Sequence, residues 1–214
     1  MANDYAENAA AIKEAHDRKL QRIRDRYDRK EITAELRDTL ISRNVVATRA
    51  HLAQLREAEQ AERATRRRTL ERRLFAPTGT DGTDPATRSA AFRQARKEAA
   101  ALDDEGAIAE QLRAAVRADD KLMAKALFER AHDITQVTQG TSLNRVVAAY
   151  LNEVEPEKVD DYRELHEMAT EERSLGGRFA RESTYLMPTP REVERYQDHR
   201  LNQLADDPRF ADVK

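Results

Sequence analysis

Residues 28–36 read Asp-Arg-Lys-Glu-Ile-Thr-Ala-Glu-Leu, and they separate two long stretches with helical apolar spacing. Thr33 is a residue type favoured at helix N-caps and follows Ile32, so a new helix is predicted to begin there. On both sides of it, apolar residues recur every three or four positions, which places them on one helix face. The stretch therefore predicts a turn between two long helices, an αα-hairpin.

Each predicted helix carries one narrow apolar seam. The seam positions are Ile12, His16, Leu20, Ile23 and Tyr27 before the turn, and Ile41, Val45, Thr48, Leu52 and Leu55 after it. The second set is spaced like the heptads of a coiled coil. We interpret the apolar members as a partner-binding seam, namely Ile12, Leu20, Ile23, Tyr27, Ile41, Val45, Leu52 and Leu55.

The composition predicts an all-α protein with a thin core. Of the 214 residues, 36% are charged and 39% hydrophobic, and only 6 Gly and 6 Pro interrupt the chain. Frequent Ala, Arg, Glu, Leu and Gln are typical of long helices. Cysteine is absent, which excludes disulfides and thiolate sites. No stretch approaches the length of an apolar membrane span and no signal peptide is recognisable, so we expect a cytoplasmic location in the producing cell.

Charge and turn residues divide the chain. Residues 1–74 hold 18 Lys and Arg against 13 Asp and Glu, a net charge of +5, whereas 75–214 have a net charge of −7. The predicted organisation is a basic hairpin arm (1–74), a flexible linker rich in Gly, Pro and Thr (75–85), an acidic helical bundle (86–175) and a tail (176–214). Asp84 and Pro85 predict the N-cap and first residue of the bundle's first helix.

The tail is predicted to begin at Gly176-Gly177. Met187-Pro188-Thr189-Pro190 predicts an extended kink, because a residue before proline disfavours the helical region. A C-terminal helix is then expected from about Arg191, docking either on a neighbouring subunit or on its own chain.

A cluster of arginines ends the arm, with six arginines and one acid, Glu71, in eleven residues. It comprises Arg63, Arg66, Arg67, Arg68, Arg72 and Arg73. The stripe suits nucleic-acid phosphates, an acidic partner surface, the chain's own acidic region, or a solvated helix face. Protein contacts are favoured over nucleic acid, because stacking aromatics are absent from the cluster and the pI is about 6.3.

Sites for catalysis and metals are not predicted. Glu129 and His132 have the Glu-x-x-His spacing of di-iron bundles, but the motif occurs once, and His166-Glu167 lacks the second histidine of a zincin. All five histidines are interpreted as surface or helix-end residues. No Gly-rich phosphate loop or nucleophile motif is present. We therefore expect a protein that is not an enzyme, with no metal, cofactor or small-molecule substrate.

The Ala- and Arg-rich, cysteine-free, charge-segregated chain resembles small helical proteins encoded among the head and tail genes of tailed phages of actinobacteria. The resemblance is one of overall texture, with 30 Arg against 8 Lys. It implies a structural or assembly role in the virion, as a capsid-associated, scaffold-like or head–tail component. The expected partners are other protein subunits, through self-association or within a larger assembly. The alternative is a nucleic-acid-binding accessory or regulator that uses the arginines of 63–73.

Overall fold

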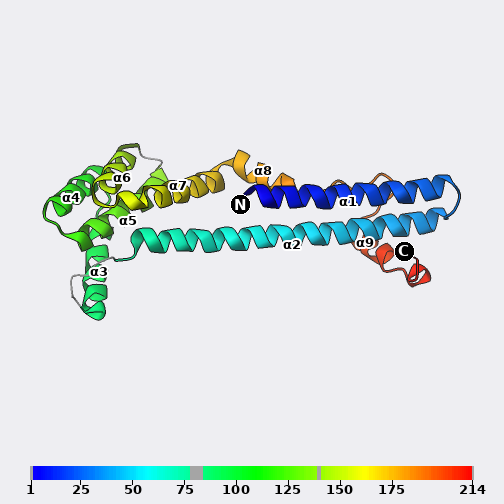
Figure 1. Ribbon diagram of the computed structural model, residues 1–214, viewed down its shortest axis with the longest axis horizontal. Coiled ribbons are helices and arrows are strands. Elements are labelled where there is room, and N and C mark those ends of the chain that lie inside the picture. The colour runs from blue at the N-terminus through cyan, green and yellow to red at the C-terminus, as the bar shows by residue number, and fades with distance from the viewer. Residues whose placement is uncertain (1, 78–83, 139–140, 214) are drawn as a thin grey trace. The chain divides into compact units, whose positions relative to one another are not determined.

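The computed structural model describes residues 2–77, 84–138 and 141–213, and all regular structure in these ranges is helical (Figure 1). The all-α class predicted from composition is therefore confirmed. The chain divides into two compact units, unit 1 (Met1–Ala64 and Ser174–Lys214) and unit 2 (Thr65–Arg173). The division lies inside one long helix, ten residues before the end of the predicted arm.

Unit 1 contains helix α1 (Ala2–Asp28) and most of α2 (Ala34–Phe75), which run antiparallel side by side (Figure 1). α1 ends in a Schellman turn, with Lys30 at a φ of 61°. The Lys30 amide donates to the Tyr27 carbonyl and the Glu31 amide to the Arg26 carbonyl, both at 2.9 Å. α2 then begins at the predicted cap, because Thr33 Oγ1 accepts from the Leu36 amide at 3.2 Å.

The rest of unit 1 is the tail, where the structure corrects the predicted boundaries. Gly176 and Gly177 lie in the first turn of α8 (Leu175–Tyr185), whose N-cap Ser174 accepts from the Gly177 amide at 3.2 Å. An extended segment over 186–190 follows, as the prolines predict. The last α-helix, α9 (Asp198–Ala205), begins seven residues later than expected, because 191–196 form turns with i→i+3 hydrogen bonds. A 3₁₀ turn, η2 (Pro208–Phe210), comes after it.

Unit 2 is a bundle of short helices packed with the last part of α2. The helices are α3 (Pro85–Ala100), α4 (Glu105–Arg117), α5 (Lys121–Thr138), α6 (Thr141–Val154), the 3₁₀ turn η1 (Pro156–Lys158) and α7 (Val159–Arg173). Asp84 and Asp120 cap α3 and α5 by accepting from amides at 3.0 Å. Of the predicted linker, residues 78–83 lie outside the described residues, while Phe75 ends α2.

The core of unit 2 is built around Phe128 of α5, which is fully buried. Its ring lies 5.2 Å from that of Phe75 and 5.1 Å from that of Tyr150, measured between centroids. Tyr162 of α7 packs on the same ring at 5.7 Å. Aromatic rings at these separations attract one another beyond their buried area. Four of the eleven Phe and Tyr residues of the sequence thus meet at one point, where helices α2, α5, α6 and α7 come together.

Candidate interaction surfaces

The predicted partner-binding seam lies in the interior of unit 1. Leu20, Ile23, Ile41, Val45 and Leu52 are buried, and Ile12, Tyr27 and Leu55 are half-buried. Val193 and Leu201 of the tail pack into the same core. The seam is therefore covered by the chain's own residues, and a partner in this structure would meet other surfaces.

A polar layer crosses this seam. His16 Nδ1 lies 3.2 Å from Thr48 Oγ1, and the Asn44 side-chain amide donates to the His16 carbonyl at 3.1 Å. Thr48 Oγ1 donates to the Asn44 carbonyl at 2.7 Å, so its lone pairs are available to the histidine. Burial lowers the pKa of His16. The prediction that every histidine is a surface or helix-end residue is wrong here, because His16 occupies a seam position.

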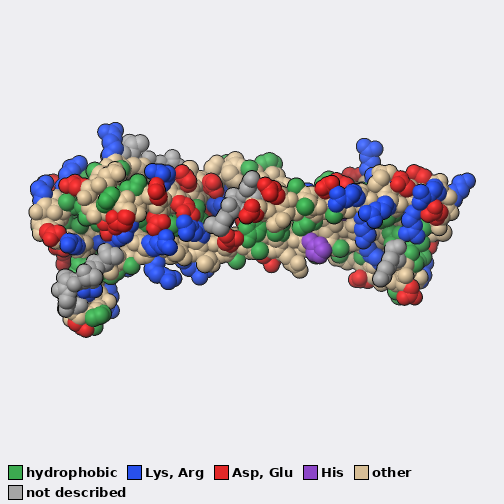
Figure 2. Space-filling view, viewed as in Figure 1, with side chains coloured by type: hydrophobic (Ala, Val, Ile, Leu, Met, Phe, Trp, Pro, Cys, Tyr) green, Lys and Arg blue, Asp and Glu red, His purple; other side chains and the backbone are tan. Residues whose placement is uncertain are grey.

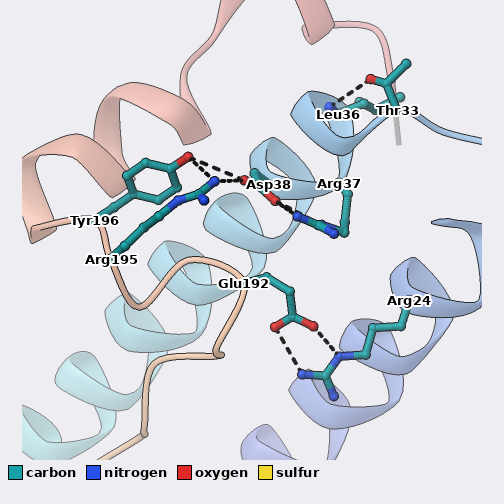
Figure 3. Close-up of polar contacts among 8 residues, drawn as sticks. All are labelled: Arg24, Thr33, Leu36, Arg37, Asp38, Glu192, Arg195 and Tyr196. Atoms are coloured by element: carbon teal, nitrogen blue, oxygen red, sulfur yellow. Dashed lines mark hydrogen bonds and ion pairs between the residues drawn. The ribbon is translucent and has the colours of Figure 1, made fainter. Parts of the chain in front are cut away.

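The tail is held to the hairpin by ion pairs (Figure 3). The Arg24 guanidinium donates two hydrogen bonds to the Glu192 carboxylate, at 2.7 and 3.1 Å. This contact lowers the pKa of the Glu192 carboxyl. Asp38, which is buried, accepts from Arg37 at 2.6 Å and from Arg195 at 3.0 Å. Bidentate and charge-assisted bonds of this kind fix geometry strongly.

The end of the chain is fixed by one side chain, Arg43 of α2. Its guanidinium donates to the carbonyls of Ala205 at 2.7 Å, Phe210 at 2.8 Å and Val213 at 3.1 Å. A cation at the carboxyl end of a helix meets both the free carbonyls and the negative end of the dipole. Of the two docking alternatives for the C-terminal helix, the structure shows packing on its own chain.

The arginine cluster is engaged largely within the chain. Three of its six members pair with α7: Arg66 with Glu164 (2.7 Å), Arg67 with Glu172 (3.0 Å) and Arg73 with Asp161 (3.6 Å). The hydrogen bond from Arg66 lowers the pKa of Glu164. Arg68 and Arg72 are exposed, and Arg63 is half-buried. Among the alternatives left open by the sequence, the chain's own acidic region is the one observed for these three arginines.

The Glu-x-x-His pair of α5 serves packing and an ion pair. The His132 ring is buried between Phe75 (5.1 Å) and Tyr162 (5.6 Å), so this histidine, too, is not at the surface as predicted. Burial lowers its pKa to about 4. Glu129 accepts from Arg96 at 2.7 Å. In the ranges that the structure describes, no three His, Asp or Glu side chains gather closely enough to hold a metal ion.

A buried ion pair was not foreseen from the sequence. Lys125 of α5 contacts Glu155, and Lys158 reaches the other oxygen of that carboxylate at 2.8 Å. Burial lowers the pKa of Lys125 to about 8. One carboxylate shared by two lysines suits a structural anchor between helix α5 and turn η1. Lys125 and Glu155 lie thirty residues apart, so sequence spacing gives no signal for their contact.

The largest exposed apolar side chains lie on and just after α8. Leu175, Phe179 and Leu186 are 76%, 71% and 64% exposed. Leu175 and Phe179, four residues apart, lie on one face of α8, and Leu186 is the C-cap residue that follows the helix. We call these three residues the α8 stripe. Isolated exposed apolar residues are ordinary, whereas several large ones close together form a candidate interaction surface. The sequence prediction missed the stripe because the tail from Gly176 was predicted as an extended kink plus a C-terminal helix, without helix α8.

Charged side chains of both signs are mixed over the visible face (Figure 2). Within the described residues, no helix is long and apolar enough to cross a membrane. No family model matches the chain, and no curated protein or solved structure is significantly similar to it.

Proposed function

We propose that this chain is a non-enzymatic helical structural or assembly protein that acts through protein–protein contacts, and that it self-associates through the α8 stripe. The observation that carries the proposal is the exposure of Leu175, Phe179 and Leu186 on a helix that is otherwise tied down. Arg56 pairs with Glu182 at 2.7 Å, and Tyr185 donates to Glu59 at 2.7 Å. The stripe is therefore presented on an anchored helix.

The spacing of the row favours a second copy as the occupant. Leu175, Phe179, Glu182 and Leu186 are separated by four, three and four residues, a spacing that is the same in both directions. Two such rows related by a two-fold axis pair antiparallel, with Leu175 of one copy against Leu186 of the other. Glu182, the one charged member of the row, already has Arg56 as its counter-ion.

The magnitude expected for this contact is small. Burying six large apolar side chains at about 2 kcal/mol each gives about 12 kcal/mol. Association itself costs roughly 4–15 kcal/mol in lost freedom. If the cost lies in the lower part of that range, about 4–8 kcal/mol, the net free energy of about 4–8 kcal/mol corresponds to a dissociation constant between about 1 mM and 1 μM, and a higher cost leaves no measurable dimer. Weak contacts of this kind are reinforced when many copies meet in an assembly.

The test is sedimentation velocity of the full chain over a concentration series. The wild type should shift toward a dimer as the concentration approaches about 1 mM. Phe179→Glu should remain monomeric, whereas Ala180→Glu, which adds the same charge to another exposed face of α8, should associate like the wild type. A wild type that stays monomeric, or a Phe179→Glu variant that associates equally well, refutes the proposal.

We extend the proposal to virion morphogenesis as the setting, on the compositional resemblance alone. This part is tested separately by looking for the protein in purified virus particles and in assembly intermediates. A virion component is found in the particles, whereas a scaffold-like protein is found in the intermediates and is absent from the particles. We do not extend it to nucleic acid, because Arg66, Arg67 and Arg73 already meet carboxylates of α7.

A further inference from the structure

Unit 2 has an open groove between α4 and α6, with a volume of about 280 Å³. Its apolar floor is formed by Leu112 and Val116 of α4 and by Val146 and Tyr150 of α6. Leu112 and Tyr150 belong to the buried core, so the floor is a fixed part of the bundle.

The rim of the groove is basic, although the surrounding sequence is acidic. Residues 103–174 hold 17 acids against 9 bases. Five of the nine bases pair with carboxylates, namely Lys121, Lys125, Arg130, Lys158 and Arg163. Arg173 donates to the Ala169 carbonyl. The three that have no hydrogen bond or ion pair with the residues described are Arg113, Arg117 and Arg145, and all three line this groove.

We infer that the α4–α6 groove binds an acidic amphipathic helix of another protein. Its apolar floor would receive the partner's apolar side chains, while Arg113, Arg117 and Arg145, all exposed, would meet the partner's carboxylates. Glu153 is the single carboxylate among the lining residues, so the groove keeps a net positive charge.

The dimensions favour a helix over a small molecule. The α6 residues lining the groove run from Arg145 to Glu153, about 12 Å along the helix, which matches roughly two turns of a partner. A volume of about 280 Å³ is at the small end of the range for drug-sized ligands. It accommodates one or two inserted side chains.

The chemistry also favours protein over nucleic acid. A nucleobase stacks on an exposed aromatic ring, but the Tyr150 side chain is only 5% exposed and stacks on Phe128, with the ring centroids 5.1 Å apart. The rest of the floor is aliphatic and offers phosphates no contact. An aliphatic floor inside a rim of guanidinium groups complements the apolar row and acidic flanks of an amphipathic helix.

The test uses a fluorescent helical peptide of about 14 residues, with Leu at i, i+3, i+4 and i+7 and Glu at the flanking positions. Fluorescence anisotropy should show binding to the full chain, and the same peptide with Lys in place of Glu should not bind. Arg113→Glu/Arg145→Glu should weaken binding at least about tenfold. Arg68→Glu/Arg72→Glu has the same change in charge at exposed positions of α2 outside the groove, and should change binding less than about twofold.

Three outcomes overturn the inference. The first is that the acidic peptide does not bind at about 1 mM, and the second is that both double variants weaken peptide binding equally. The third is that a single-stranded oligonucleotide binds more tightly than the peptide and that its binding depends on Arg113 and Arg145. Far-UV circular dichroism of each variant checks that the fold is kept. The inference does not depend on the α8 stripe, because the groove variants leave α8 unchanged and should self-associate like the wild type.

Discussion

Replacing His132 by Phe should reduce the loss of unfolding free energy as the pH falls below neutral. Burial, aided by the nearby His166, Arg67 and Arg173, lowers the pKa of His132 from 6.5 to about 4. The folded chain therefore keeps His132 neutral while the unfolded chain binds a proton below pH 6.5, so stability is present above that pH and is lost as pH falls toward 4. A difference of 2.5 units at 1.36 kcal/mol each corresponds to about 3 kcal/mol.

At neutral pH the variant should be at least as stable as the wild type. His132 Nδ1 is buried without a hydrogen-bond partner, which costs about 1–3 kcal/mol, and Phe removes that atom. The new ring keeps the contacts with Phe75 and Tyr162, and its slightly larger size costs about 1 kcal/mol. The variant should therefore be as stable as the wild type, or slightly more stable, at neutral pH. Below pH 6.5 the difference in unfolding free energy between the variant and the wild type should grow steadily.

The assay is urea unfolding, followed by far-UV circular dichroism, at intervals from about pH 7.5 to pH 4. His51→Phe, the same substitution at an exposed position of α2, is the control and should leave the slope of stability against pH unchanged. Proton NMR of the imidazole resonances gives an independent reading of the same pKa. A His132 resonance that titrates near 6.5, or two variants with parallel profiles, would refute the reasoning.

Three further predictions concern stability and are checked by the same urea titrations at neutral pH. Thr33→Ala removes the N-cap of α2 and should cost about 1 kcal/mol, while Thr33→Ser keeps a capping hydroxyl at an exposed position and should be near neutral. Lys30→Gly should stabilise by up to about 1 kcal/mol because it relieves a positive φ, and Lys30→Ala should be near neutral. Glu155→Leu leaves two lysines without their carboxylate and should cost about 3–5 kcal/mol, more than Lys125→Met, which leaves Glu155 paired with Lys158.

The hairpin elements could be predicted because their signals are local. Thr33 marks the start of α2 through a bond to the amide three residues on, and the seam spacing recurs within each helix. The same reasoning placed His16 on the seam, yet treated it as a surface histidine. Its burial depends on Thr48 and Asn44, which lie about thirty residues away and supply polar partners in the core.

The tail could not be predicted at the same level, because distant contacts decide its conformation. The pair Gly176-Gly177 predicts the start of the tail, but in the first turn of a helix the flexibility of these residues costs little once Ser174 satisfies an amide. The segment after Pro190 has helical spacing, and yet it forms turns. Glu192 pairs with Arg24, 168 residues away in sequence, and this geometry prevails over local propensity.

The role of the arginine cluster was similarly undetermined. Six arginines within eleven residues are compatible with nucleic-acid phosphates, a partner protein or the chain's own acidic residues, because charge carries no information on which distant residues will lie nearby. The structure pairs Arg66 with Glu164, 98 residues away. The basic rim of the α4–α6 groove could not be predicted for the same reason, because Arg113 and Arg145 line one groove only when α4 packs beside α6.

The polar layer of unit 1 bears on where function should be sought. A seam made only of aliphatic residues repeats every turn or two, so two helices can slide past each other at small cost. His16, Asn44 and Thr48 remove that freedom, because any other register would bury their polar groups without partners. Replacing the contacts within this hairpin by contacts with a partner helix would leave these polar groups without hydrogen bonds, so the seam should stay within the hairpin. The protein contacts that we propose should therefore use surfaces that folding leaves uncovered. The exposed apolar α8 stripe and the α4–α6 groove, with its three exposed arginines, are two such surfaces.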